Sequence, residues 1–505
     1  MNSTVLLVVV FGYFGLLLAI AWYTSRGAGE HAFYSGERKS LWWIVAFGMV
    51  GTSLSGVTFI SVPGAVYKSQ WTYLQVVIGF VIGYWVVASV LLPLYYRLQL
   101  TSIYSYLRQR FGEVSYKSGS TLFIVSRLLG ATARIYIVLY VIHRFLLESI
   151  GIPFWVTSSV VLLMIFLYTL QGGVKTIVWT DTLQTLFMLA ALVGTIGYII
   201  SDPTMVDWKQ QLADSGMLRV IDSDWKSAQF FVKQILSGIF ITIAMTGLDQ
   251  EMMQKNLSVR TLAGAQKNMW VFSGVLLLTN VLFLLLGALV YLKVQQLGLE
   301  MPAKSDDLFP TLALKHFPVW LGLLFIIGLI SALFPSADGA LTALTASTCI
   351  DLIGIRDRNW DEPKQIRVRK TVHLGIAFLF QALVMWFYWR NDESIIKTVL
   401  DLAAITYGPL LGLFSFGILT KRMTREPLVP IVCIGAAVIS YLLRAFSKDL
   451  FGGYQMGFET LLVNGMLTYG GLWLISYFPD SRSAIKSESS SGVSNSNIPE
   501  GMIET

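Results

Sequence analysis

Long apolar runs occupy most of this 505-residue chain. A helix needs about 20 mostly apolar residues to cross the hydrocarbon core of a bilayer. Thirteen runs of about that length follow one another, at residues 4–23, 41–66, 71–96, 118–143, 152–170, 176–200, 231–250, 268–292, 317–347, 372–390, 395–420, 427–446 and 457–478. We therefore predict an all-α integral membrane protein with about thirteen transmembrane helices.

The composition agrees with this class. Hydrophobic residues make up 55% of the chain and charged residues 13%, against about 25% charged residues in soluble domains. This balance excludes a soluble enzyme, a nucleic-acid-binding protein and a disordered scaffold. The two cysteines, Cys349 and Cys433, lie within apolar runs, so we expect no disulfide framework. The four histidines show no metal-ligand spacing, and we expect neither a transition metal nor an enzymatic activity.

The basic residues predict the orientation. An odd number of spans places the two termini on opposite sides of the membrane. With the N-terminus outside, about 22 of the 37 Lys and Arg residues fall in cytoplasmic segments and about 13 in outer ones, as the positive-inside rule requires. We predict an N-out, C-in protein of the plasma membrane, and its short loops favour a prokaryotic inner membrane. Residues 479–505, which are rich in Ser, are predicted to form a disordered cytoplasmic tail.

Ionisable residues within the predicted spans are candidates for function, because charge is costly in a bilayer. Asp181 and Asp338 lie deep in the sixth and ninth spans, and each needs a cation, a proton or an arginine as its partner. Arg127 and Arg134 are seven residues apart and share one face of the fourth span. The two arginines either bind a ligand or pair with the two aspartates. Two further aspartates lie near span ends, where they either act in the site or simply contact water: Asp249 and Asp401.

Two spans contain stretches that weaken a helix. In the second span, small and hydroxylated residues run from Val50 to Thr58 (VGTSLSGVT), and in the ninth, Pro335 frees the carbonyl of Ser331. Each stretch either permits close packing or a kink, or breaks the helix so that oxygen atoms line a cavity. Carbonyl and hydroxyl oxygens suit a hard cation such as Na⁺. We predict two spans broken at mid-depth.

The order of the spans suggests an internal repeat. Residues 41–200 and 231–420 each contain five spans, so the second set must run with inverted topology. The seventh span has a weak point at residues 242–247 (TIAMTG), which is equivalent to the break of the second span. Residues 1–40 add a first span with a cytoplasmic loop, and residues 427–478 add two C-terminal spans. Together these features predict a secondary transporter with alternating access.

Five stretches resemble the sodium/solute symporter family, which includes sodium–glucose, sodium–proline, iodide and bacterial sialic-acid symporters. They are GTSLSGVTFISVPGAV (51–66), LYTLQGGVKTIVWTDTLQ (167–184), GLDQEMMQK (247–255), the ninth span ending at CID (349–351) and YGPLLGLFSFGILTKR (407–422). The most specific pattern is GG-x5-WTD-x2-Q. The resemblance implies a LeuT-type fold of two inverted five-helix repeats, with uptake coupled to inward Na⁺ movement.

The resemblance also implies a main Na⁺ site. Its second-span carbonyls fall here on Gly51 and Leu54, and its ninth-span carbonyl and hydroxyl fall on Ala332 and Ser336. Pro335 departs from the family, since it stands where another hydroxyl is expected.

Two carboxylates complete the predicted cation-binding set. Asp181 matches the family aspartate that is associated with a second Na⁺ or with proton access. Asp338 falls where members with two sodium sites carry a serine. Relative to the family, one hydroxyl oxygen is lost at Pro335 and one carboxylate is gained at Asp338. The sequence therefore predicts neither the number of Na⁺ ions per cycle nor whether Asp338 couples transport to protons.

The substrate is expected at the same depth, framed by Ser53, Ser55, Thr58, Tyr73 and Gln75. The three hydroxylated positions resemble those of sialic-acid symporters, which use a fourth-span arginine for the substrate carboxylate. That family position falls near Ala131, one turn before Arg134. An arginine can bind a carboxylate bidentately, so we predict an organic acid or acidic sugar. The aromatic residues of sugar transporters are replaced here by Ala244, Met245 and Thr246, although a neutral sugar, polyol, amino acid or vitamin remains an alternative.

The leading prediction is therefore Na⁺-coupled symport of a small organic solute. A proton-coupled or uncoupled transporter and a non-transporting sensor are the alternatives. We expect the lipid bilayer, Na⁺ and the solute as partners, no nucleic acid, and no cofactor besides the coupling ion. The oligomeric state is not predicted.

Overall fold

The computed structural model describes residues 3–25, 40–390 and 395–478. The predicted tail at 479–505 and most of the loop after the first span lie outside these residues. The main helices are α1 (Ser3–Ser25), α3 (Trp42–Ser53), α4 (Gly56–Ser69), α5 (Tyr73–Val86), α6 (Leu92–Arg97), α7 (Ser105–Arg110), α8 (Glu113–Ile142), α9 (Phe154–Ile200), α10 (Trp208–Asp214), α11 (Phe231–Thr242), α12 (Gln250–Leu257), α13 (Leu262–Gln296), α14 (Leu308–Thr311), α15 (Val319–Ser347), α16 (Glu362–Arg390), α17 (Ile395–Thr406), α18 (Gly408–Leu419), α19 (Val429–Ala445), α20 (Ser447–Leu450) and α21 (Thr460–Leu474).

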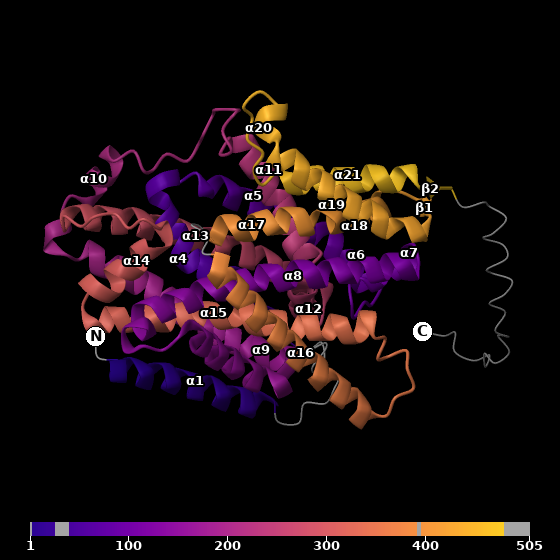
Figure 1. Cartoon of the computed structure of the whole chain (residues 1–505), viewed down its shortest axis with the longest axis horizontal. Helices are drawn as coiled ribbons and strands as arrows, with labels where there is room; N and C mark the ends of the chain where they lie inside the picture. Colours follow the sequence, from indigo (N-terminus) through magenta and orange to yellow (C-terminus); the bar gives the residue numbers. More distant parts are fainter. Residues whose placement is uncertain (1–2, 26–39, 391–394, 479–505) are drawn as a thin grey trace, which may run out of the picture.

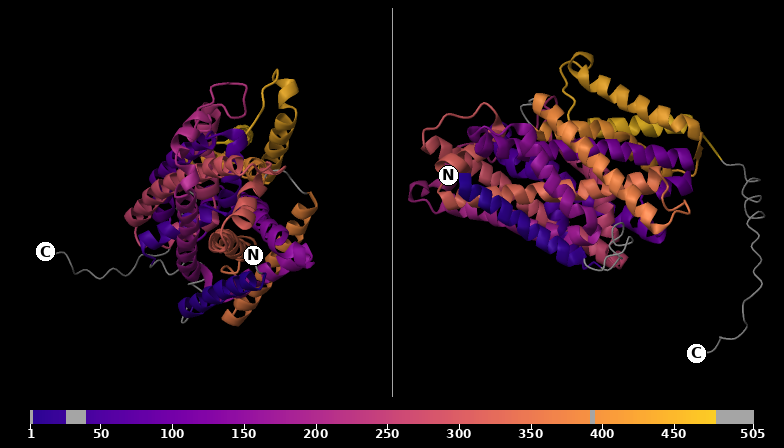
Figure 2. Two further views of the ribbon diagram at one scale, coloured as in Figure 1. Left: turned by 90° about the vertical axis from the view of Figure 1, so that its left-hand side faces the viewer. Right: turned by 60° about the horizontal axis from the view of Figure 1, so that its bottom comes forward.

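The long helices run along one common direction and form an elongated bundle (Figures 1 and 2). Helix α1 lies along one side of the bundle, where it packs against α9 and α15. Helices α18, α19 and α21 pack together on another side. The first residues of α1 and the short strand β2 (Ser476–Tyr477) lie at opposite ends of the long axis (Figure 1). An odd number of crossings would separate them in this way.

Each of the thirteen predicted apolar runs falls on helix. Within the described residues, seven helices are long and apolar enough to cross a membrane, or up to nine if each bent pair is one span. Three shorter apolar helices add to these, at Val8–Thr24, Phe154–Leu170 and Gly408–Leu419. Helix α9 covers two predicted runs, 152–170 and 176–200. The structure is mostly helical, as predicted, with one antiparallel pair of two-residue strands, β1 (Met423–Thr424) and β2. The number of crossings, the N-out orientation and the inverted repeats stay predictions.

Two helix pairs are sharply bent. Helices α3 and α4 meet at 55°, at Leu54 and Ser55, and Ser55 is extended with φ −73° and ψ 176°. Helix α11 continues through a π-helical turn, η6 (Ile243–Gly247), and meets α12 at 66°. Asp249 begins α12 because its carboxylate accepts hydrogen bonds from two backbone N–H groups of the first turn. Each bend lies in the first span of a predicted five-helix repeat, so the two bends occupy equivalent positions in the two predicted repeats.

The prediction of a broken ninth span is wrong. Helix α15 is continuous through Pro335, and every residue from Gly328 to Ser347 is buried. A helix that is buried all round needs partners on every side, and α15 packs against α3, α8, α9 and α16. Tertiary packing therefore holds the helix together although Pro335 provides no N–H for the carbonyl of Ser331.

Candidate functional site

A cavity of about 100 Å³ lies beside the bend between α3 and α4. Residues of α5, α8, α11, η6 and α12 complete its wall. Its lining consists of Thr52, Ser53, Ser55, Val57, Thr58, Tyr73, Phe80, Tyr84, Arg127, Arg134, Ile241, Thr242, Met245, Thr246 and Met252. Five of the six predicted substrate residues are among them. The bend thus brings hydroxyl groups of two helix ends to one small polar space.

Gln75 does not line this cavity, in contrast to the prediction. Its side chain is buried, and its amide nitrogen donates to the backbone carbonyls of Thr72 (3.1 Å) and Gln229 (3.2 Å). Gln75 therefore ties the start of α5 to the segment before α11, which is a structural role that sequence spacing alone could not distinguish from ligand binding.

The two arginines of α8 have different surroundings. The guanidinium of Arg127 forms a salt bridge with Glu251 and lies 3.6 Å from the carboxylate of Asp249. Arg134 forms no hydrogen bond and no salt bridge with any side chain in 3–25, 40–390 or 395–478, and its side chain lines the cavity. Neither arginine forms a salt bridge with Asp181 or Asp338, so the predicted pairing of the arginines with those aspartates is wrong. Arg134 is thus a cation available to a ligand.

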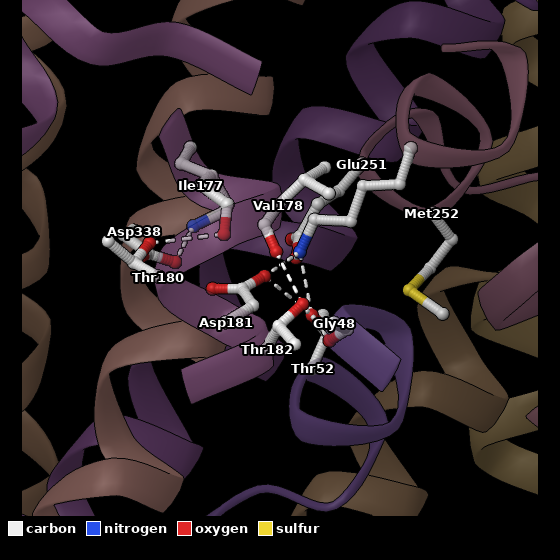
Figure 3. A network of polar contacts seen from close by, with 12 residues as sticks. Gly48, Thr52, Ile177, Val178, Thr180, Asp181, Thr182, Glu251, Met252 and Asp338 are labelled. Carbon is white, nitrogen blue, oxygen red and sulfur yellow. Dashed lines mark hydrogen bonds and ion pairs between the residues drawn. The ribbon is translucent and has the colours of Figure 1, made fainter. Parts of the chain in front are cut away.

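Asp181 has a partner that the sequence analysis missed. Its Oδ2 accepts a hydrogen bond from the ammonium group of Lys255 at 2.7 Å and one from Thr52 at 3.2 Å. Lys255 also donates to the hydroxyl of Thr52 at 2.6 Å. Oδ1 of Asp181 is buried without a hydrogen-bond partner among the described residues. Figure 3 shows Thr52, Asp181 and Glu251 around these contacts.

These groups belong to a larger buried charge cluster, defined here as Arg127, Asp181, Asp249, Glu251 and Lys255. All five are at most 3% exposed. Asp249 also accepts a hydrogen bond from the hydroxyl of Tyr407 at 2.8 Å, so it is buried in the protein and does not contact water. The cluster holds three carboxylates and two cations. The bend before α12 places residues 251–255 (EMMQK) inside the bundle. In the sequence, these residues lie between two predicted spans and have the polar composition of a loop.

Asp338 lies apart from Asp181 (Figure 3). Its carboxylate is fully buried and accepts hydrogen bonds from the Tyr168 hydroxyl and from the backbone N–H of Gly339. Tyr168 is 170 residues away in sequence, and no local signal pointed to it. The two predicted cation-binding carboxylates therefore occupy different surroundings.

The residues of the predicted main Na⁺ site come from α3 and α15, which pack against each other. A methyl group added to Gly51 would lie at an ordinary contact distance of 3.5 Å from Cγ of Pro335 but only 2.3 Å from the Thr185 hydroxyl, so it would clash with α9 and not with α15. The Ser336 hydroxyl is buried without a hydrogen-bond partner in the described part of the chain. Because α3 ends at Ser53, the carbonyls that follow Val50 in its last turn have no intrahelical donor, whereas that of Val50 accepts from the N–H of Leu54. Gly51, Leu54 and Ser336 thus offer oxygen atoms near one helix contact.

The sequence of this chain is similar to those of known sodium-coupled transporters. The sequence matches the sodium:solute symporter family over residues 33–427. It is 23% identical over 488 residues to the sodium/sialic acid symporter SiaT of Proteus mirabilis (strain HI4320), which covers 91% of this chain and 94% of that protein. It is 27% identical over 431 residues to the sodium-coupled monocarboxylate transporter 1 of Mus musculus, covering 81% of this chain and 68% of the relative.

The fold is shared with a solved structure. The substrate-bound outward-open state of a Na⁺-coupled sialic acid symporter superimposes with a TM-score of 0.78, at 19% sequence identity, over 93% of this chain and 97% of that chain. The structural match shows the fold, and the sequence match over residues 33–427 shows the family. This multi-pass membrane protein belongs to the sodium:solute symporter family.

Proposed function

We propose that this protein takes up an organic acid or an acidic sugar by Na⁺-coupled symport with alternating access. The observation that carries the proposal is the guanidinium of Arg134, which lines a polar cavity without an acidic partner among the described side chains. A desolvated guanidinium needs acceptors, and a carboxylate provides two in a matching geometry. The hydroxyl groups of Ser53, Ser55 and Thr58 line the same cavity and are suited to bind sugar or acid oxygens.

The names of the relatives support this substrate class. SiaT is a sodium/sialic acid symporter and the mouse relative is a sodium-coupled monocarboxylate transporter. Sialic acids and monocarboxylates share a carboxylate group, and Arg134 would bind that group here. The plasma membrane, and a bacterial inner membrane in particular, is the proposed location.

For the coupling ion, we propose a Na⁺ site at the contact between α3 and α15. The carbonyls of Gly51, Leu54 and Ala332 and the hydroxyl of Ser336 would supply the ligands, and oxygen donors of this kind suit Na⁺. Asp181 offers its unpartnered Oδ1 to a cation, while Lys255 holds its Oδ2. Asp338 is a further candidate, although Tyr168 and Gly339 already donate to it.

Ligand-dependent stability of the purified protein tests this function. A ligand that binds the folded state raises the apparent melting temperature by mass action. We expect NaCl, but neither KCl nor choline chloride, to raise it, and sialic acid or a short monocarboxylate to raise it further in Na⁺. Proteoliposomes with an inward Na⁺ gradient should then accumulate the stabilising acid. Stabilisation by acidification without any Na⁺ effect would instead favour proton coupling, and no response to either would favour a sensor.

The Na⁺ site has its own prediction. Ser336→Ala removes one proposed ligand, and a hydrogen bond or contact to a charged group is worth about 1.5–3 kcal/mol. We therefore expect the Na⁺ concentration for half-maximal uptake to rise by about 10-fold or more. Thr342→Val is the matched control, because Thr342 also lies on α15 and its buried hydroxyl has no hydrogen-bond partner among the described residues. Equal Na⁺ activation of the Ser336→Ala variant and the wild type would contradict the site.

A further inference from the structure

A second, larger cavity of about 620 Å³ adjoins the substrate cavity. Most of its lining residues come from α4, α17, α19 and α20 and from the segments before α11, α14 and α21. Tyr73 lines both cavities. This outer vestibule has the volume of a typical small-molecule pocket, about 300–1,000 Å³, whereas the inner cavity is smaller than that range. In the N-out orientation, the vestibule opens toward the outside.

The ionisable residues that line the vestibule are mostly basic. They are Lys68, Asp401, Arg444 and Lys448. Three cations thus face one carboxylate, and no other charged residue is among the lining residues. A cleft with one prevailing sign of charge raises the local concentration of counter-ions and speeds their association. The vestibule therefore favours anions.

Arg444, which lines this vestibule, has an unsatisfied donor among the described residues. One guanidinium nitrogen, Nη2, donates to Oδ1 of Asp401. The other terminal nitrogen, Nη1, is buried and has no hydrogen-bond partner within the described ranges. Asp401 thereby holds the guanidinium in place and leaves one edge for a further acceptor. Lys448 and Lys68 are exposed, and no salt bridge to another described residue neutralises them.

From these observations we infer that the outer vestibule is an access site for the carboxylate of the solute. The carboxylate binds first to Nη1 of Arg444 and to Lys448, and the solute then passes Tyr73 to reach Arg134 in the inner cavity. The inference rests on the proposed uptake of an organic acid. It assigns Asp401 a positioning role, since this carboxylate orients Arg444 and does not itself bind an anion.

Uptake kinetics in proteoliposomes test the inference, with sialic acid and a short monocarboxylate as probes. Arg444→Gln and Lys448→Gln should each raise KM by about 3- to 10-fold, because they slow capture of the anion, while the maximal rate stays within about two-fold. Raising the ionic strength with choline chloride at fixed Na⁺ should remove most of the difference from wild type. Lys209→Gln, a loss of the same charge on the exposed face of α10, is the control and should leave KM unchanged.

The outcomes separate the inference from the proposed function. Loss of uptake in Arg134→Gln, together with an unchanged KM in both Arg444→Gln and Lys448→Gln, would overturn the vestibule site and leave the proposed function standing. Normal uptake in Arg134→Gln would overturn both. Lys448 forms no ion pair with any residue that the structure describes, and Asp401 is paired with Arg444, so an effect of Lys448→Gln on KM cannot come from the loss of the Asp401 contact. An unchanged Na⁺-dependent melting temperature shows that each variant is folded.

Discussion

Arg134→Gln is expected to abolish uptake of the acidic solute while the protein still binds Na⁺. Truncating one partner of a desolvated charge pair costs about 2–5 kcal/mol or more, which corresponds to a loss of about 30- to 5,000-fold in kcat/KM. The effect is large because the other lining residues are hydroxyl, aromatic and apolar groups and Arg127, whose guanidinium is already bound to Glu251. The proposed Na⁺ ligands lie on other residues, so stabilisation by NaCl should persist. Uptake of labelled solute and the melting temperature in NaCl measure the two effects separately.

Two variants sharpen this test. Arg134→Lys keeps the charge but loses the planar fork that binds a carboxylate with two hydrogen bonds, so we expect partial activity. Arg127→Gln is the contrasting variant, because Arg127 lines the same cavity but is bound to Glu251. Its loss should lower the stability in all salts, since Asp249 then has no cation among the described residues and Glu251 retains only Lys255, at 3.6 Å. Loss of both uptake and Na⁺ stabilisation in Arg134→Gln would contradict the assignment and indicate a structural role.

The positions of the helices could be predicted from the sequence because length and hydrophobicity determine them. Each apolar run falls on helix, and the stretch from Val50 to Thr58 breaks where two glycines and several hydroxylated residues interrupt it. The same local signal located the bend after residues 242–247. Five of the six predicted substrate residues line one cavity. Ser53, Ser55 and Thr58 do so because the bend exposes them to the same space, whereas Tyr73 and Arg134 reach it from α5 and α8.

The partners of the buried charges could not be predicted in this way. Asp181 and Lys255 are 74 residues apart, and Lys255 lies in a polar stretch that has the composition of a loop. Only the bend that begins α12 carries this stretch into the bundle. At Pro335 the local signal predicted a break in the helix that the structure does not contain. The proline's local effect on a helix is real, but packing on every side of α15 overrides it.

We expect the Asp181–Lys255 pair to contribute far more to the free energy of unfolding than a surface ion pair does. Lys255→Met leaves Asp181 buried without its cation, and removal of one partner of a buried pair costs about 3–5 kcal/mol. We therefore expect a melting temperature several degrees lower and poor membrane expression. Asp181→Asn should also destabilise the protein, because Lys255 then retains only Glu251, at 3.6 Å, and the Thr52 hydroxyl. Lys267→Met, which removes an exposed ammonium over the ring of Trp42, should cost about 1 kcal/mol or less.

The double variant Asp181→Asn/Lys255→Met separates stability from cation binding. It removes one charge of each sign, so the net charge of the buried cluster is unchanged, and most of the stability should return. If Oδ1 of Asp181 also binds a cation, the double variant will fold normally and still show weak Na⁺ activation of uptake. If the pair is purely structural, Na⁺ activation will recover together with the melting temperature. A double variant as unstable as the sum of both single variants would show that the two residues do not stabilise the fold as a pair.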